Sequence, residues 1–226
     1  MDGEHAPGRP SGFLVVLSAP SGAGKNTVLA RVLPRVEGLV YSISCTTRPA
    51  RVGERDGVDY YFLTDEEFER RVAAGEFLEW AWFCGHRYGT PRAFVAEHVA
   101  RGDIVIMDID VQGSAQVKRN WPGAVRVFLL PPSLDELRRR LTRRGTESPA
   151  SVESRLDAAR RELEAVADYD YVIINDDVER AARALEAIIR AERLKVARNP
   201  WPAWVEALRK GERIDAGTAQ PGRDQG

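Results

Sequence analysis

The sequence predicts an α/β protein in which a central parallel sheet is flanked by helices. Short apolar runs alternate with segments of helical periodicity along most of the 226 residues. The first apolar run, Phe13 to Leu17, leads through a glycine-rich loop to Lys25 and a helix, which is the order found in phosphate-binding loops. A later apolar run from Ile104 ends in two carboxylates at Asp108 and Asp110. Ligand chemistry gathers at the carboxyl ends of parallel strands, so these side chains are expected at a site.

The composition is that of a globular protein with one large domain or two small ones. Its 33 basic and 34 acidic residues give a formal net charge of -1, which predicts no general attraction to nucleic acid or to an anionic membrane. No apolar run approaches the roughly 20 residues of a membrane helix. Without a secretory signal, Cys45 and Cys84 are expected to be reduced thiols of a cytoplasmic protein. Residues 1–11 are predicted to be a flexible leader.

The loop from Ala19 to Lys25 is expected to present backbone N–H groups at a helix N-terminus, where the helix dipole favours an anion. Its match to G-x-x-x-x-G-K-[ST] is incomplete. Ala19 stands at the first glycine, and Asn26 stands at the Ser or Thr that would ligate magnesium. Taken alone, Gly24 and Lys25 also fit an ordinary strand-to-helix turn. The preceding strand and the helix predicted from Thr27 favour phosphate binding.

The segment from 39 to 90 is predicted to combine short strands with an arginine-rich loop. Its expected elements are strands at 39–44, 58–63 and 77–83, a helix from Thr64 to Ala73 and a turn at 85–90. Arg48 and Arg51 flank Pro49 in a spacing that suits bidentate phosphate contacts, although two solvated arginines fit the same pattern. Glu79 is the one carboxylate of an apolar strand, so it faces either solvent or a ligand that donates hydrogen bonds.

The remainder of the chain continues the alternation of helices and strands. Helices are expected at 91–100, 112–121, 133–144, 150–167 and 178–197, and strands at 104–110, 124–130 and 169–176. Arginines crowd the two helices on either side of Gly145, which predicts a basic lid over the phosphate loop; a solvated helix face is the alternative. Residues 201–208 are expected to form a short amphipathic turn packed on the body, and the chain after 215 to be disordered.

These motifs, in this order, resemble the guanylate kinase family of nucleoside monophosphate kinases. The resemblance covers about residues 12 to 190 and rests on SISCTTRPARVGERDGVDYYFL, EFLEWAWFCGHRYGT, IVIMDIDVQG, RGTE and VIIND. It implies a P-loop kinase-type parallel sheet with a small β-rich GMP-binding insertion and a helical lid. The implied divisions are a core of 12–41, 91–132 and 168–198, an insertion of about 42–90, a lid of about 133–167 and a partly disordered tail of 199–226.

The same resemblance implies ATP-dependent phosphorylation of GMP and dGMP with magnesium. It assigns ATP binding to Ala19, Pro20, Ser21, Gly22, Ala23, Gly24, Lys25, Asn26, Thr27 and Asn175. It assigns GMP binding to Ser44, Arg48, Arg51, Tyr60, Glu79, Tyr88, Thr90 and Asp108. It implies contacts to the transferred phosphoryl group from Lys25, Arg48, Arg140, Arg144 and Arg155. Asn26 and, through water, Asp110 are the expected magnesium ligands.

Ala19 and Asn26 depart from the family pattern and leave two alternatives open. One is a catalytically silent domain of this family that binds a partner, and the other is a kinase for a related phosphorylated acceptor. Retention of Lys25, of the arginines and of the guanine-reading residues favours the GMP kinase. Nucleotides are the expected partners of a monomer or homodimer, with no nucleic acid and no membrane.

Overall fold

A five-stranded parallel sheet forms the centre of the structure, a computed structural model that describes residues 10–83, 85–143 and 149–214. Its strand order is β2 (Leu39–Tyr41), β7 (Ile104–Asp108), β1 (Phe13–Ser18), β8 (Val125–Leu130) and β9 (Tyr171–Ile174). Every pairing within this sheet is parallel. The predicted fold class is confirmed, and the strand before the phosphate loop lies in the middle of the sheet.

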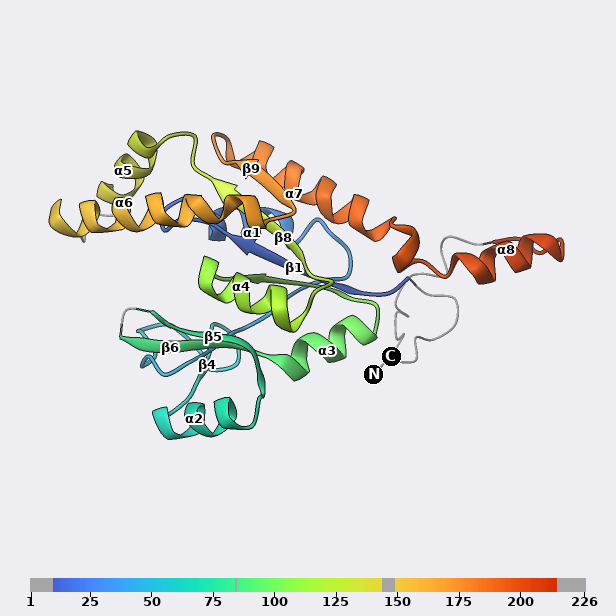
Figure 1. The fold of residues 1–226 in the computed structure, drawn as a ribbon, viewed down its shortest axis with the longest axis horizontal. Helices are drawn as coiled ribbons and strands as arrows, with labels where there is room; N and C mark the ends of the chain where they lie inside the picture. The colour runs from blue at the N-terminus through green and yellow to red at the C-terminus, as the bar shows by residue number, and fades with distance from the viewer. Residues whose placement is uncertain (1–9, 84, 144–148, 215–226) are drawn as a thin grey trace.

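Helices cover both faces of the central sheet, which explains why its strands are continuous apolar runs. Helices α1 (Lys25–Val32) and α7 (Val178–Arg193) pack on the face that carries Val15 and Leu17. Helices α3 (Arg92–Ala100) and α4 (Val111–Asn120) pack on the opposite face, with Leu14 and Val16. Figure 1 shows α4 between the central strands and a second sheet.

The second sheet is formed by the β-rich insertion. Its strand β6 (His86–Pro91) was predicted as a turn, and its strand β4 (Tyr61–Phe62) is shorter than predicted. The order of the sheet is β4, β3 (Cys45–Thr46), β6 and β5 (Phe77–Phe83), beside α2 (Asp65–Ala73). Residues 85–90, predicted as a turn, lie mostly in β6 because they pair antiparallel with β5. The strand predicted at 58–63 shrinks to two residues, since residues 57–59 form a turn in which the N–H groups of Val58 and Asp59 donate to the carbonyl oxygen of Arg55. Thr64 caps α2 as predicted.

Two arginine-rich helices lie together at the end of the molecule that also holds the phosphate loop (Figure 1). They are α5 (Leu134–Thr142), capped by Ser133, and α6 (Pro149–Leu163), which pack through Leu137, Leu141, Val152 and Leu156. The helix predicted to run to 167 ends at Leu163, and a 3-10 turn η1 (Glu164–Asp168) follows it.

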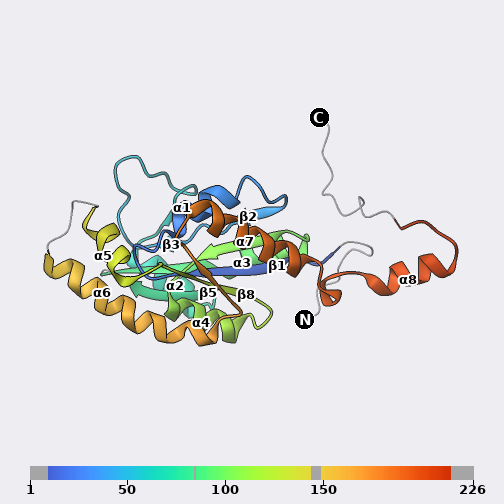
Figure 2. The same cartoon turned by 90° about the horizontal axis from the view of Figure 1, so that it is seen from above.

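The C-terminal segment differs from its prediction. After the 3-10 turn η2 (Val196–Arg198), helix α8 (Trp201–Arg209) extends away from the sheets in Figures 1 and 2. The expectation that this segment packs on the body is wrong, because none of residues 201–209 is buried. Across the described part of the chain, no helix combines the length and the apolar character needed to cross a membrane.

Candidate active site

The phosphate loop joins the carboxyl end of β1 to the first turn of α1. Gly24 precedes this helix with φ of 99°, a left-handed conformation that favours glycine. A Cβ atom at Gly24 would also lie 2.5 Å from Nδ2 of Asn175. Lys25 begins the helix, and its Nζ lies 3.5 Å from the carbonyl oxygen of Ile109. The helix dipole and a lysine at one loop make this the natural anion site of the molecule.

Two side chains predicted to contact nucleotide support the backbone of the loop in this structure. Nδ2 of Asn175 donates to the carbonyl oxygen of Ala23 at 2.6 Å, and Nη1 of Arg140 donates to the same oxygen at 3.2 Å. Arg140 also donates through Nη2 to the backbone oxygen of Asn175 at 3.0 Å. Asn175 is 1% exposed. Its side chain therefore stands behind the loop, and the geometry gives it a supporting position.

The two unusual residues of the loop occupy different surroundings. Ala19 is 4% exposed and belongs to the apolar cluster under α1, so its methyl group packs in the core. Asn26 lies in the first turn of α1, where it and Thr27 are exposed. On the lid side, Nη1 of Arg155 lies 3.5 Å from Oγ of Ser21. Arg144 lies outside the described residues.

Carboxylates surround Lys25, and one of them was missed by the sequence analysis. Asp110 caps α4, and its Oδ1 accepts from the backbone N–H of Gly113 at 2.8 Å. Glu162 on α6 faces the same region: burial raises its pKa, the charge of Lys25 opposes this rise, and the charge of Asp110 adds to it. Nothing in the local sequence marks Glu162, because only the packing of α6 brings it to the loop. Among the described residues, no cluster of three or more acidic, His or Cys side chains forms a metal site.

Glu79 is a buried carboxyl group, which rules out the alternative that its side chain faces solvent. It is 5% exposed, and Oγ1 of Thr90 on the neighbouring strand donates to its Oε1 at 2.7 Å. Burial is the main cause that raises the pKa of Glu79 to about 7, the hydrogen bond from Thr90 lowers it, and the charge of Asp110 raises it further. Such a group is prepared to accept hydrogen bonds from a ligand.

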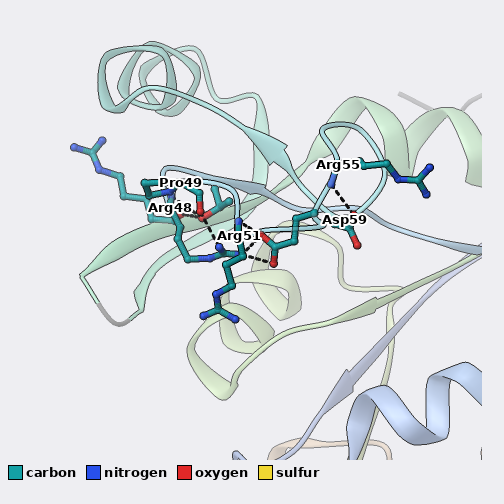
Figure 3. A network of polar contacts seen from close by, with 8 residues as sticks. Arg48, Pro49, Arg51, Arg55 and Asp59 are labelled. Carbon is teal, nitrogen blue, oxygen red and sulfur yellow. Dashed lines mark hydrogen bonds and ion pairs between the residues drawn. The ribbon is translucent and has the colours of Figure 1, made fainter. Parts of the chain in front are cut away.

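The arginine-rich loop is held by a carboxylate that the sequence analysis also missed. Nη2 of Arg48 lies 2.9 Å from both carboxylate oxygens of Glu54, and the backbone N–H of Arg51 donates to Oε2 of Glu54 at 2.8 Å. Figure 3 shows this loop, with the guanidinium of Arg51 pointing away from the Arg48 side chain. The backbone N–H of Arg55 donates to Oδ2 of Asp59 at 2.8 Å, a contact that is drawn as a dashed line in Figure 3. Glu54 thus fixes Arg48 while the Arg51 side chain stays exposed.

Two tyrosines lie beside Arg48. The guanidinium carbon lies 5.4 Å from the ring centroid of Tyr60, whose own centroid is 6.0 Å from that of Tyr88. The hydroxyl of Tyr41, which the sequence analysis did not select, donates to Asp108 at the end of β7. Ser44 is half-buried in the same insertion, and its carbonyl accepts from the N–H of Tyr61 at 3.0 Å. A cation and several hydroxyl groups therefore converge near the edge of the central sheet.

Comparison with known proteins gives a consistent result. The family model described as guanylate kinase matches residues 11–192. A guanylate kinase of Symbiobacterium thermophilum is 49% identical over 92% of this chain and 99% of its own length. One of Thermotoga maritima is 48% identical over 83% and 91%. The crystal structure of guanylate kinase from Anaplasma phagocytophilum is 33% identical, covers 92% of this chain and 100% of its own, and superposes with a TM-score of 0.72. The chain belongs to the guanylate kinase family.

Proposed function

We propose that this protein catalyses the ATP-dependent phosphorylation of GMP and dGMP to the corresponding diphosphates. The observation that carries the proposal is the buried Glu79, whose side chain has Thr90 as a hydrogen-bond partner and spare acceptor capacity. Guanine offers an N1–H and a 2-amino group at one edge, and both donate to a carboxylate. Adenine presents an unprotonated N1 there, so a site built for guanine rejects it by orders of magnitude.

The acceptor nucleotide lies between the two sheets in this proposal. Ser44 and Thr90 donate to guanine O6, Thr90 by turning its single hydroxyl proton away from Glu79, and Asp108 assists at the amino edge. The phosphate of GMP is bound by four side chains of the insertion: Arg48, Arg51, Tyr60 and Tyr88. In this structure Nη2 of Arg48 binds both carboxylate oxygens of Glu54, so the guanidinium already holds an anionic group at the place where the phosphate would bind.

The donor nucleotide lies on the phosphate loop. The backbone from Ser21 to Lys25 cradles its phosphates, and Lys25 bridges the β- and γ-phosphates. Arg48, Arg140, Arg144 and Arg155 approach the transferred group as the lid closes, and closure excludes the water that would hydrolyse ATP. The attacking oxygen of the acceptor phosphate and the leaving oxygen of ADP stand in line on opposite sides of the transferred phosphorus.

The residues at the loop fit a magnesium ion that comes with ATP and keeps several of its waters. The exposed amide of Asn26 offers one oxygen beside Lys25, and Asp110 uses only Oδ1 to cap α4. Magnesium neutralises charge on the β- and γ-phosphates when it is bound. Asn26 and, through water, Asp110 are the residues that would hold it. The amide ligand predicts a weaker or more water-mediated site than a hydroxyl would give.

We also place the enzyme in the cytoplasm, as a monomer or a homodimer. Cys45 supports a reducing compartment, since it is a free thiol whose pKa is raised to about 11 by burial. A thiol of this kind is protonated at neutral pH and is unreactive.

A coupled assay of ADP formation with a panel of acceptors tests the function. We expect turnover with GMP and dGMP, and turnover lower by orders of magnitude with AMP, UMP and ribose phosphates. GMP binding without turnover would favour a catalytically silent domain. Preference for another acceptor would favour the alternative of a kinase that acts on a related phosphorylated acceptor.

A further inference from the structure

Strand β5, which carries Glu79, is an edge strand of the second sheet, and side chains of α4 bind its outer edge. The amide of Gln116 bonds both backbone groups of Trp80: Nε2 donates to the carbonyl oxygen at 2.7 Å, and Oε1 accepts from the N–H at 3.2 Å. Nδ2 of Asn120 donates to the carbonyl oxygen of Leu78 at 2.7 Å. The helix thus supplies the hydrogen bonds that another strand would make.

Glu79 lies between the two residues whose backbones are held. On its other side β5 pairs with β6, where Glu79 stands opposite Thr90. The helix also approaches the carboxylate directly, because a Cβ atom at Gly113 would lie 2.7 Å from Oε2 of Glu79. Gly113, Gln116 and Asn120 are spaced by three and four residues, so they share one face of α4. That face sets the position of the Glu79 carboxylate.

The two contacts of α4 do not carry equal weight. Leu78 has its own anchor, because its side chain is 0% exposed in the apolar cluster of the central sheet. Trp80 is half-buried and packs on Phe68 and the apolar cluster of the second sheet, away from the central sheet. Its side chain therefore anchors β5 within the second sheet, and the amide of Gln116 is the contact that ties its backbone to α4.

We propose that Gln116 is a positioning residue that sets the selectivity of the acceptor site for a purine carrying a 2-amino group. The proposal rests on the GMP kinase function proposed above and assigns Gln116 no contact with the nucleotide. Two hydrogen bonds from guanine to one carboxylate require both carboxylate oxygens in fixed places. Inosine monophosphate lacks the 2-amino group, makes one such bond and tolerates a displaced carboxylate better.

The test compares the binding of GMP and of inosine monophosphate to Gln116→Leu by calorimetry without ATP. We expect the dissociation constant for GMP to rise about tenfold, the size of a lost buried hydrogen bond, while that for inosine monophosphate rises much less. The affinity for ATP alone should not change. Should Gln116→Leu fail to fold, Gln116→Asn, whose amide is one methylene shorter, takes its place with the same expected direction.

Two variants on the same helix serve as comparisons. Arg119→Ala removes an exposed side chain beside Gln116's face and should leave both dissociation constants unchanged. Asn120→Ala should change the GMP preference less than Gln116→Leu does, because Leu78 keeps its apolar anchor. An unchanged ratio of the two affinities in Gln116→Leu, or an equal loss for GMP and ATP, would overturn the proposal. Absence of GMP turnover by the wild type would instead overturn the proposed function, since the binding ratio needs no turnover.

Discussion

Burial of the Glu79 carboxyl group links both folding and acceptor binding to pH at the level of one residue. Its pKa is about 7 in the folded protein, against the ordinary value of 4.5. Between these values the folded protein holds a proton that the unfolded chain has lost. The contribution of Glu79 to stability is therefore complete below pH 4.5 and is lost as the pH rises through 7. The difference corresponds to about 3 kcal/mol.

We predict that Glu79→Gln, without nucleotide, is more stable than the wild type at pH 8 by up to about 3 kcal/mol and gains nothing at pH 4.5. The neutral amide carries no charge to desolvate and can still accept from Thr90. Urea unfolding at the two pH values measures the difference. Glu76→Gln, at an exposed position three residues earlier, is the control and should show no such pH dependence. A gain of equal size at both pH values would contradict the assignment.

The acceptor affinity gives a second prediction for the same group. Because guanine donates to the ionised carboxylate, GMP should bind the wild type more tightly as the pH rises through about 7. Below that pH the affinity should fall toward tenfold per pH unit. Calorimetric titration between pH 5.5 and 8 checks this, and Glu79→Gln should bind weakly and keep only the dependence that comes from the GMP phosphate, whose second pKa is about 6. The same pH dependence in the wild type and in Glu79→Gln would mean that Glu79 does not titrate in the site.

Asn26 is the other residue whose chemistry is specific to this chain. We predict that Asn26→Ser lowers the magnesium concentration needed for half-maximal rate, because a hydroxyl ligand is shorter than the amide by one atom. Steady-state rates over a magnesium series, at fixed ATP and GMP, provide the measurement. Thr27→Ser, one position further along α1, is a matched control that should leave the magnesium dependence as it is. An unchanged magnesium dependence and rate in Asn26→Ser would contradict the prediction that the amide of Asn26 weakens the magnesium site.

At the scale of elements, the phosphate loop depends on its neighbours for its shape. The end of β9 supplies Asn175 and α5 supplies Arg140, and both donate to the carbonyl oxygen of Ala23. With that carbonyl bound behind the loop, the N–H groups of the following residues are directed into the anion site. An error in the packing of α5 or β9 would therefore appear as weaker binding of ATP.

We predict that Asn175→Ala raises the KM for ATP about tenfold, because one buried hydrogen bond at 2.6 Å is lost. The KM for GMP should change much less, since the hydrogen bonds of Asn175 go to Ala23, Arg140 and Leu130, on the donor side of the site. Steady-state kinetics with each substrate varied in turn separates the two. Asn199→Ala removes an amide that binds the carbonyl oxygens of Arg193 and Lys195, at and just after the end of α7, and should leave both constants unchanged. Equal increases in both would indicate general loosening of the fold.

At the scale of the whole molecule, one buried carboxylate joins the segment after α7 to the start of β1 and to β9. Glu192 is 1% exposed and accepts from Tyr171 of β9 at 2.6 Å, from Lys195 at 2.7 Å and from Arg198 at 3.0 Å. The guanidinium of Arg198 lies 4.2 Å from the ring centroid of Phe13, at the start of β1. These hydrogen bonds outweigh the effect of burial and lower the pKa of Glu192.

We predict that Glu192→Ala lowers the free energy of unfolding by about 3 kcal/mol, because two cations lose their buried partner. The kcat should be retained at 25 °C, since the cluster lies at the opposite end of the sheet from the phosphate loop. Because the folded pKa is lowered, the contribution of Glu192 is present above the ordinary value and is lost as the pH falls through the folded one. Chemical denaturation at neutral and acidic pH measures the loss of stability and its pH dependence, and steady-state kinetics at 25 °C measures the kcat. Glu206→Ala on the exposed α8 is the control.

The sequence by itself determined the central sheet, the phosphate loop and the residues placed at its carboxyl edge. These depend on local patterns: a strand buried on both faces is apolar throughout, and Gly24 is required by its own backbone conformation. It also singled out Glu79, but it left open whether this carboxylate faces solvent or a ligand. Only the tertiary structure decided that this carboxylate is buried, because burial depends on α4 and β6 packing around it.

Two of the residues that the sequence analysis missed share the same cause. Gln116 and Glu162 lie in segments whose local pattern is that of ordinary polar surface, and each acts on a partner that another element supplies. Glu54 differs, because it binds Arg48 and Arg51 within its own loop. The 85–90 segment became a strand because β5 supplied its hydrogen bonds, and α8 extends away from the sheets with none of its residues buried. Periodicity and turn chemistry are local properties of the chain, whereas these contacts join elements that meet only when the chain has folded.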